Sequence, residues 1–317
     1  MPDTHLIASI LAIEFLSLTG QQSLTNLTYI PHCPSFRGPG HTRFIMEINS
    51  LFDVKGKVVL VTGGARGIGR MIATGFVANG AKVYIASRNA QACEAAAAEL
   101  TAQGPGTCHA IPADLLSLSE CERLVAELRR REPALHVLVN NSGATWGAAI
   151  EEFPDEQWTR ILTLNLTRTF TLTQKLLPLL EAAGNRSGTT KDKNEDGGPA
   201  AVINIGSING LSAPAVENYS YSASKAGLHH LGRHLSQTLG PRGITVNTLA
   251  CGPFDTRMMA HAFRNFRDVI EEGNPLGRHG RPGDVAGACI FLASRAGSYV
   301  NGATINIDGG VHLGAKL

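Results

Sequence analysis

Residues 58–69 (VVLVTGGARGIG) constrain the fold more than any other stretch of the chain. Residues 58–61 form a short, continuously apolar run, which is typical of a parallel strand buried on both faces. Glycines follow at positions 63, 67 and 69, and apolar residues then recur at helical spacing over 70–79. We therefore expect a strand, a tight glycine turn and a helix.

The glycine turn is suited to binding a phosphate. Glycine lets the backbone turn tightly and lets a ligand approach without a Cβ in the way. The N-terminus of the following helix offers free N–H groups and a partial positive charge to an anion. The spacing of Gly63, Gly67 and Gly69 nevertheless differs from the G-x-G-x-x-G pattern of dinucleotide-binding turns. On this stretch alone, an ordinary glycine-rich strand–helix turn therefore stays open.

Apolar runs and helical patterns alternate along the rest of the chain. Further strands are expected at residues 82–86, 107–112, 136–139, 201–205, 244–249 and 303–307. Helices are expected at residues 90–100, 118–131, 155–181, 221–239, 255–272 and 284–293. The alternation predicts an α/β fold, with a single doubly wound parallel sheet of Rossmann type and helices on both faces. Ligands of such sheets bind at the carboxyl ends of the strands.

The composition excludes several classes of function. The chain has 317 residues and a net charge of +2, which gives no electrostatic reason to expect nucleic acid as a partner. The six cysteines are scattered without paired spacing, so we expect reduced thiols and neither a disulfide framework nor a metal site. His229 and His230 are interpreted as ordinary helix residues, because no partner ligands are spaced for a metal.

Residues 1–46 differ from the rest of the chain. The apolar stretch 6–18 is interrupted by Glu14 and is too short to span a bilayer. It also lacks the basic residues that precede a secretory signal. We expect a poorly ordered extension at 1–46, a folded domain at 47–317 and no membrane association. A cytoplasmic location follows, with a mitochondrial one as the alternative.

The end of the second expected strand bears on the choice of cofactor. At this place in a dinucleotide-binding sheet an acid binds the ribose 2′-OH of NAD, whereas an arginine accommodates the 2′-phosphate of NADP. The chain has Ser87 and Arg88 there and no acid, and Arg66 lies within the glycine turn. Either arginine alone is typical of a solvated surface, but the two together favour NADP(H).

Four motifs in order extend this interpretation to the whole chain. They are TGGARGIG at 62–69, NNSG at 140–143, Ser207 ahead of YSASK at 221–225, and NIDGG at 306–310. With them, residues 50–312 resemble the classical short-chain dehydrogenase/reductase family, most closely the 3-oxoacyl-carrier-protein reductase type. The resemblance makes 47–317 a Rossmann-fold catalytic domain.

The chain departs from the family pattern at three places. Ser142 stands where alanine is usual, and the loop 184–199 is longer than in compact members. Cys251 replaces the proline that usually precedes Gly252, so we expect a looser backbone there.

The resemblance assigns catalysis to Asn165, Ser207, Tyr221 and Lys225. Tyr221 and Lys225 are four residues apart on an expected helix and share one face. A nearby ammonium can lower the pKa of tyrosine from about 10 by roughly 1–3 units. Ser207 can donate a hydrogen bond to the substrate oxygen as charge develops there, and by resemblance Asn165 anchors a water that links Lys225 to solvent. The alternative is an exposed helix face that happens to carry these residues.

The turn, the strand end and the resemblance together imply the cofactor contacts. They are Gly63, Arg66, Gly67, Ile68, Gly69, Ser87, Arg88, Asp114, Leu115, Asn141, Gly143, Tyr221, Lys225, Gly252, Pro253 and Thr256. By resemblance, Asp114 binds the adenine, and residues 252–256 approach the nicotinamide. Trp146 is open between a core position and a substrate contact.

The chain is thus expected to be an NADPH-dependent reductase of a small-molecule ketone or 3-oxoacyl carbonyl, with Tyr221 as proton donor. The alternatives are an NAD-linked alcohol dehydrogenase that works oxidatively and a catalytically inactive cofactor-binding subunit. By resemblance, the helices at 118–131 and 155–181 pair across a two-fold axis in a homodimer or homotetramer.

Overall fold

A parallel sheet forms the centre of the computed structural model, which describes residues 47–184 and 198–314. Within these residues the sheet has seven strands in the order β3-β2-β1-β4-β5-β6-β7, and all pairings are parallel. The strands are β1 (Val58–Thr62), β2 (Lys82–Ala86), β3 (Thr107–Ala110), β4 (Val137–Asn140), β5 (Ala200–Ile205), β6 (Ile244–Cys251) and β7 (Thr304–Ile307). The expected extension 1–46 and most of the loop 184–199 lie outside the described residues.

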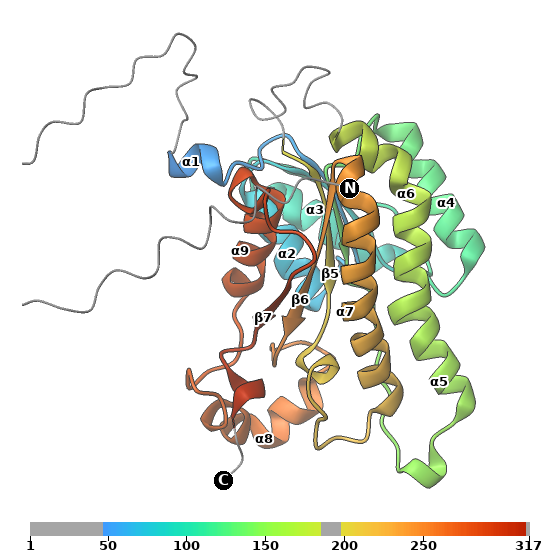
Figure 1. The fold of residues 1–317 in the computed structure, drawn as a ribbon, viewed down its shortest axis with the longest axis vertical. Helices are drawn as coiled ribbons and strands as arrows, with labels where there is room; N and C mark the ends of the chain where they lie inside the picture. The colour runs from blue at the N-terminus through green and yellow to red at the C-terminus, as the bar shows by residue number, and fades with distance from the viewer. Residues whose placement is uncertain (1–46, 185–197, 315–317) are drawn as a thin grey trace, which may run out of the picture. The chain divides into compact units, whose positions relative to one another are not determined.

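Helices cover both faces of the sheet and enclose two apolar cores (Figure 1). One face packs against α2 (Gly67–Ala78), α3 (Ala90–Gln103) and α9 (Pro282–Ala293). The other packs against α4 (Leu118–Arg131), α6 (Arg168–Gly184) and α7 (Tyr219–Leu239). Every residue of β1, β4, β5 and β6 is buried, because helices lie on both sides of these strands. The predicted doubly wound α/β fold is confirmed.

The strand order reverses between β1 and β4. From β1 the next strands of the chain are added on one side of the sheet, as β2 and β3, and from β4 they are added on the other side, as β5, β6 and β7. In such sheets a crevice forms where the two halves diverge, at the carboxyl ends of the strands. The glycine turn follows β1 and the NNSG segment follows β4, so both motifs lie at this crevice. Helix α1 (Ile48–Leu51) precedes β1 and takes no part in it.

One helix of the sequence prediction is wrong. A continuous helix was expected over 155–181, whereas the structure has α5 (Asp155–Leu162), a π turn at Thr163–Thr167 and then α6. The N–H of Arg168 bonds to the carbonyl of Thr163, five residues earlier. Helix α6 continues through Pro178, so the interruption falls at Asn165 rather than at the proline.

The helix expected from residue 255 is also shorter than predicted. Helix α8 (Ala260–Glu272) begins five residues later and has a non-helical residue at Phe266. Phe254 bridges to Gly280, and the Gly280 N–H donates to the carbonyl of Pro253. Residues 255–259 then form bends and turns before the helix begins. The five cysteines of the described ranges are buried and free. No helix within those ranges has the length and apolar character needed to cross a membrane.

Candidate active site

Ser207 lies just beyond the end of β5 and is buried. Its backbone is extended, and it caps a short 3₁₀ helix at Ile208–Gly210. The Oγ atom accepts a hydrogen bond from the N–H of Asn209 over 3.2 Å. The same hydroxyl also carries one proton that it can donate.

Tyr221 and Lys225 lie one turn apart in α7, and their side chains lie close to each other. The Nζ atom of Lys225 is 5.6 Å from the centroid of the Tyr221 ring and donates to the carbonyl of Ile205 over 2.7 Å. Lys225 is buried and Tyr221 is half-buried. The Tyr221 hydroxyl interacts with the side chain of Ser207. The structure thus brings together three of the four predicted catalytic residues.

Burial determines the protonation of these groups. It raises the pKa of Tyr221 above the ordinary 10.0, and the hydrogen bond with Ser207 offsets this only in part. It lowers the pKa of Lys225 to about 8. The prediction that Lys225 lowers the pKa of Tyr221 is therefore wrong for the protein alone, since desolvation of the phenol is the larger effect. Tyr221 carries its proton at neutral pH.

Asn165 lies in the π turn, and its side chain joins two segments of the site. Its Oδ1 atom accepts from the N–H of Ala144 over 2.9 Å, and its Nδ2 atom donates to the carbonyl of Ala144 over 3.0 Å. Nδ2 also donates to the Oγ of Ser224, in α7, over 2.9 Å. A Cβ at Gly143 would lie 3.2 Å from Oδ1, a tight contact. Asn165 therefore fixes the loop after β4 against the helix that carries Tyr221.

The glycine turn forms a cradle that larger residues would fill. Gly63 and Gly67 have φ values of +68° and +55°, in the left-handed region that favours glycine. A Cβ at Gly69 would overlap the carbonyl oxygen of Gly63. The Nδ2 atom of Asn141 donates to the carbonyl of Thr62 over 2.8 Å and so holds the NNSG segment against the turn. Helix α2 begins at Gly67, so its free N–H groups, including that of Ile68, are available to an anion.

The end of β2 lies beside this turn. The Oγ of Ser87 accepts from the N–H of Ala65 over 3.3 Å and ties the two segments together. Arg66 and Arg88 are exposed, and neither guanidinium has a partner among the described residues. The cradle and these two free positive charges fit the pyrophosphate and the 2′-phosphate of a dinucleotide.

Two further predicted contacts follow β3. Asp114 is half-buried, and its Oδ1 atom accepts from the N–H of Leu116 over 3.1 Å. Leu115 is buried in the apolar core on the α4 side. The Asp114 backbone carbonyl also accepts from the N–H of Ser117, the residue that caps α4. These bonds fix the strand-end loop at the same edge of the sheet.

Gly252, Pro253 and Thr256 follow β6 on the opposite side of the cradle. The Gly252 N–H donates to the carbonyl of Ile307, and a Cβ there would lie 2.6 Å from the Cβ of Asp308. A Cβ added at Gly67 would lie 3.4 Å from the methyl group of Thr256. A hollow of about 490 Å³ opens between the start of α2 and this segment.

Cys251 keeps the strand β6 regular up to its last residue. Its Sγ atom contacts the carbonyl of Leu249 over 3.8 Å, and the thiol is buried beside Lys225. Burial raises its pKa to about 12, so the group is a neutral thiol. The predicted loosening of the backbone is not seen, because Cys251 pairs with Ile307 in the sheet.

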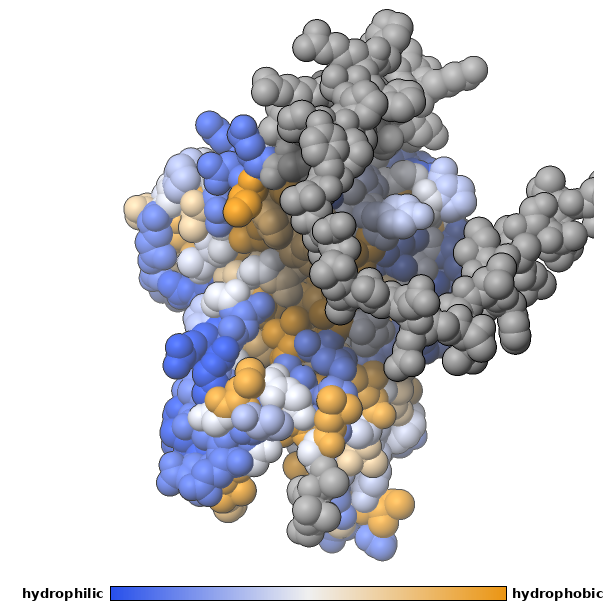
Figure 2. Space-filling view, turned by 60° about the vertical axis from the view of Figure 1, so that its left-hand side comes forward, coloured by the Kyte–Doolittle hydropathy of each residue, from blue (hydrophilic) through white to orange (hydrophobic). Residues whose placement is uncertain are grey.

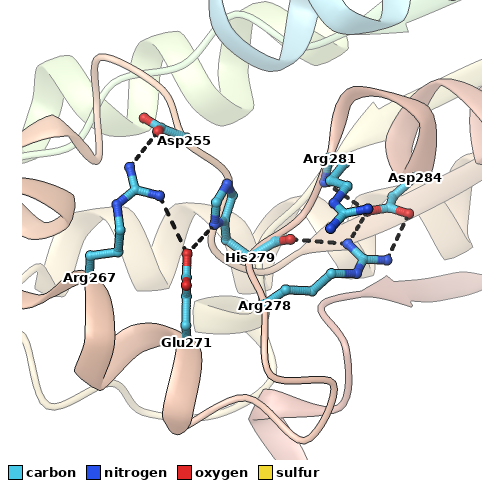
Figure 3. A network of polar contacts seen from close by, with 7 residues as sticks. All are labelled: Asp255, Arg267, Glu271, Arg278, His279, Arg281 and Asp284. Carbon is cyan, nitrogen blue, oxygen red and sulfur yellow. Dashed lines mark hydrogen bonds and ion pairs between the residues drawn. The ribbon is translucent and has the colours of Figure 1, made fainter.

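Ion pairs fasten α8 to the segments around it (Figure 3). Arg267 contacts Asp255 over 2.8 Å and Glu271 over 3.4 Å, and Glu271 also contacts Nδ1 of His279 over 2.6 Å. Arg278 binds both carboxylate oxygens of Asp284 at the start of α9. The position of α8 therefore depends on charges at the surface.

Apolar side chains are exposed on α8 and in the segment before it. Figure 2 shows apolar surface among hydrophilic residues over the part of the molecule where α8 lies in Figure 1. The exposed apolar residues of this part include Met258, Phe266 and Val269. Trp146, after β4, is 40% exposed, so it is no core residue.

The sequence analysis missed the position of His229. Its side chain is buried, and its Nε2 atom lies 3.4 Å from the backbone nitrogen of Ser207. It was interpreted as an ordinary helix residue because only metal binding was considered. The available signal was its spacing, since it follows Lys225 by four residues and shares its helix face. His230, by contrast, is exposed.

Known proteins are similar to this chain in sequence and in fold. A family model described as enoyl-(acyl carrier protein) reductase matches residues 63–312. The rhamnolipids biosynthesis 3-oxoacyl-[acyl-carrier-protein] reductase of Pseudomonas aeruginosa is 44% identical over 265 residues, which cover 83% of this chain and 98% of that protein. The 3-oxoacyl-[acyl-carrier-protein] reductase FabG of Chlamydia trachomatis is 34% identical, over 80% of this chain and 97% of that protein.

Solved structures are similar over the same extent. The Pseudomonas aeruginosa RhlG/NADP active-site complex has a TM-score of 0.76 at 43% identity, and covers 83% of this chain and 99% of that chain. A gluconate 5-dehydrogenase from Burkholderia cenocepacia in complex with NADP and tartrate has a TM-score of 0.74 at 28% identity. The match covers 84% of this chain and 99% of that chain. With the parallel sheet, the glycine cradle and the Ser207–Tyr221–Lys225 cluster in place, these matches establish that the chain belongs to the short-chain dehydrogenase/reductase family.

Proposed function

We propose that this chain reduces the ketone of a 3-oxoacyl thioester to an alcohol with NADPH. The enzyme is an NADP-dependent oxidoreductase that acts on CH–OH or carbonyl groups. The observation that carries the proposal is the meeting of Ser207, Tyr221 and Lys225 beside the glycine cradle. The substrate class is taken from the names of the relatives from Pseudomonas aeruginosa and Chlamydia trachomatis, both 3-oxoacyl-carrier-protein reductases.

The residues that would hold the cofactor are those of the cradle and the strand ends. The N-terminus of α2 and the glycine turn would bind the pyrophosphate, and Arg66 and Arg88 the 2′-phosphate. Asp114 and Asn141 line the edge on which the rest of the nucleotide would lie. When bound, NADPH supplies the hydride that reduces the carbonyl carbon.

Tyr221 donates the proton in this reaction. Since burial raises its pKa, the phenol is protonated at neutral pH and can transfer its proton to the carbonyl oxygen. The phenol becomes a phenolate in that step, and the ammonium form of Lys225, 5.6 Å from the ring, stabilises the new negative charge. The oxidative, NAD-linked alternative is disfavoured by Arg88, which stands where an acid would bind the ribose 2′-OH of NAD.

Ser207 stabilises charge on the substrate oxygen. The Asn209 N–H occupies one lone pair of Oγ, and the hydroxyl has one proton that it can donate to the substrate oxygen. A preorganised donor aimed at an oxygen that gains negative charge lowers the barrier. An intact set of three groups also argues against the alternative of an inactive cofactor-binding subunit.

Asn165 acts by holding the site together. Both hydrogens of its amide are used, by Ala144 and Ser224. The water that family resemblance places between Asn165 and Lys225 stays a prediction. The backbone carbonyl of Asn165 accepts from the Thr169 hydroxyl over 3.2 Å and keeps a second lone pair for such a water, whereas the side-chain amide has no free donor.

Substrate choice can be tested against NADPH oxidation. The purified full chain should oxidise NADPH with 3-oxoacyl thioesters of increasing chain length, because Trp146 and Met258 present exposed apolar surface in the segments that follow β4 and β6. A polar keto sugar acid is the comparison, since a gluconate 5-dehydrogenase has a similar fold. Turnover of the sugar acid alone would overturn the substrate class, and no turnover with any ketone would overturn the proposed function.

Assembly and location also remain part of the proposal. A homodimer or homotetramer through α4, α5 and α6 is supported by Trp158 and Phe170, which are exposed apolar residues of these helices. A cytoplasmic location stays a prediction.

A further inference from the structure

His229 lies on the inner face of α7, one turn beyond Lys225, and only 2% of it is exposed. Its Nε2 atom accepts a hydrogen bond from the backbone N–H of Ser207 over 3.4 Å. Among the described residues no other acceptor serves this N–H, because β5 ends at Ile205. The imidazole therefore supports the backbone of the residue whose hydroxyl faces Tyr221.

Two glycines make room for the imidazole. A Cβ at Gly206 would overlap Nε2 of His229, and a Cβ at Gly210 would lie 2.8 Å from its Cε1 atom. Both glycines belong to the segment that carries Ser207. The backbone on either side of the serine thus closes around the ring edge, which couples the position of the ring to that of Ser207.

The hydrogen bond from the Ser207 N–H to His229 requires burial of a polar imidazole, which an apolar side chain at this position would avoid. Burial, with the charges of Lys225 and Arg233, lowers the pKa of His229 to about 4, so the ring is neutral. Because Nε2 accepts a bond, the proton is on Nδ1, which is buried without a partner in the described part of the chain. A leucine would remove this unpaired group but would leave the Ser207 N–H without an acceptor.

We propose that His229 is a positioning residue, which holds Ser207 so that its hydroxyl meets the substrate oxygen. The role rests on the proposed function, since it is defined for the reaction at that site. His229 touches no reacting atom in this arrangement. It acts through the backbone of Ser207, and its removal changes the place of the hydroxyl rather than its chemistry.

Three substitutions and a control test the contact. In His229→Gln the amide ends near the position of Nε2 and can accept the same bond, whereas in His229→Asn it ends near Nδ1 and cannot. His229→Leu removes the acceptor altogether. We expect kcat to fall about 10- to 100-fold in the Leu and Asn variants, as for a misplaced catalytic group, and less than about fivefold in the Gln variant. The exposed neighbour gives the control, since His230→Gln should match the wild type.

A double-substitution cycle separates positioning from general destabilisation. If His229 acts through Ser207, His229→Leu should lower kcat little further when Ser207→Ala is already present. The Kd of NADPH, from its fluorescence, should stay unchanged in every variant. The proposal would be overturned if His229→Leu lowered kcat by the same factor with and without Ser207→Ala. It would also be overturned if the Gln and Asn variants had equal kcat. If the Leu variant does not fold, the comparison of kcat between the His229→Gln and His229→Asn variants tests the proposal.

A spectroscopic readout keeps this inference apart from the proposed function. In ¹⁵N-histidine NMR of the full chain, His229 should show the neutral Nδ1–H form with no titration between pH 5 and 8. A ring that titrates in that range would refute the contact, even in an active enzyme. A wild type that reduces no ketone would refute the proposed function, while the NMR signal still reports on the contact.

Discussion

Arg88→Ala tests how the protein selects NADPH. Arg88 follows β2 directly, is exposed, and has no partner among the described residues. Its removal therefore breaks no contact within the described part of the fold. A change in cofactor affinity can therefore be assigned to loss of the contact between the guanidinium and the 2′-phosphate.

The size of the effect follows from that contact. A hydrogen bond to a charged group contributes about 1.5–3 kcal/mol net, which corresponds to roughly one to two powers of ten in affinity. The lower end is the better expectation, because Arg88 is exposed and its charge is well solvated. The KM for NADPH should thus rise about tenfold or more. kcat at saturating NADPH should change little, since the contact is equal in ground and transition states.

Initial rates with NADPH and NADH give the measurement. NADH has no 2′-phosphate, so its kinetics should be nearly unchanged in Arg88→Ala. Arg264→Ala is the matched control, because Arg264 is also exposed without a described partner but lies on α8. Weakening of NADH and NADPH by the same factor would show that Arg88 is structural. Equal use of both cofactors by the wild type would refute the interpretation of this strand end.

Four further outcomes are expected. Tyr221→Phe should lower kcat by about 10²- to 10⁴-fold through loss of the proton donor, with the Kd of NADPH preserved; ordinary turnover would contradict the mechanism. Since the pKa of Lys225 is lowered to about 8 from 10.5, the folded state binds fewer protons than the unfolded state between these values, and this group makes the free energy of unfolding rise with pH there. Urea unfolding at pH 8 and 10 should show that the rise is smaller in Lys225→Met. A chain that begins at Met46 should fold and turn over like the full chain, and loss of soluble cofactor-binding protein would disprove this. Light scattering at micromolar concentration should show a dimer or tetramer, and a monomer would count against pairing through α4 to α6.

The sheet and its crevice could be predicted because the sequence marks them locally. Residues 58–61 are apolar throughout, as a strand covered on both faces requires, and every residue of β1 is buried. Tyr221 and Lys225 could be placed together from helical spacing alone. Their convergence with Ser207 depends on the strand order, which the alternation of strands and helices implies.

The π turn could not be predicted from periodicity. Ile161, Asn165, Leu172 and Leu176 are all buried, and their spacing fits one continuous helix as well as an interrupted one. The interruption depends on hydrogen bonds from Asn165 to Ala144 and Ser224, which are distant in sequence. The protonation of Tyr221 was mispredicted for a similar reason, because desolvation depends on the packed surroundings and not on the neighbour four residues away.

The attachment of α8 makes one side of the site sensitive to dissolved ions (Figure 3). The pairs of Arg267 with Asp255 and Glu271 join groups that water reaches, so each pair contributes little to stability. Salt screens exposed charges over about 8 Å at physiological ionic strength, but it screens buried ones much less. Ionic strength should therefore adjust how firmly α8 is held, while the buried Lys225 that serves Tyr221 is left almost untouched.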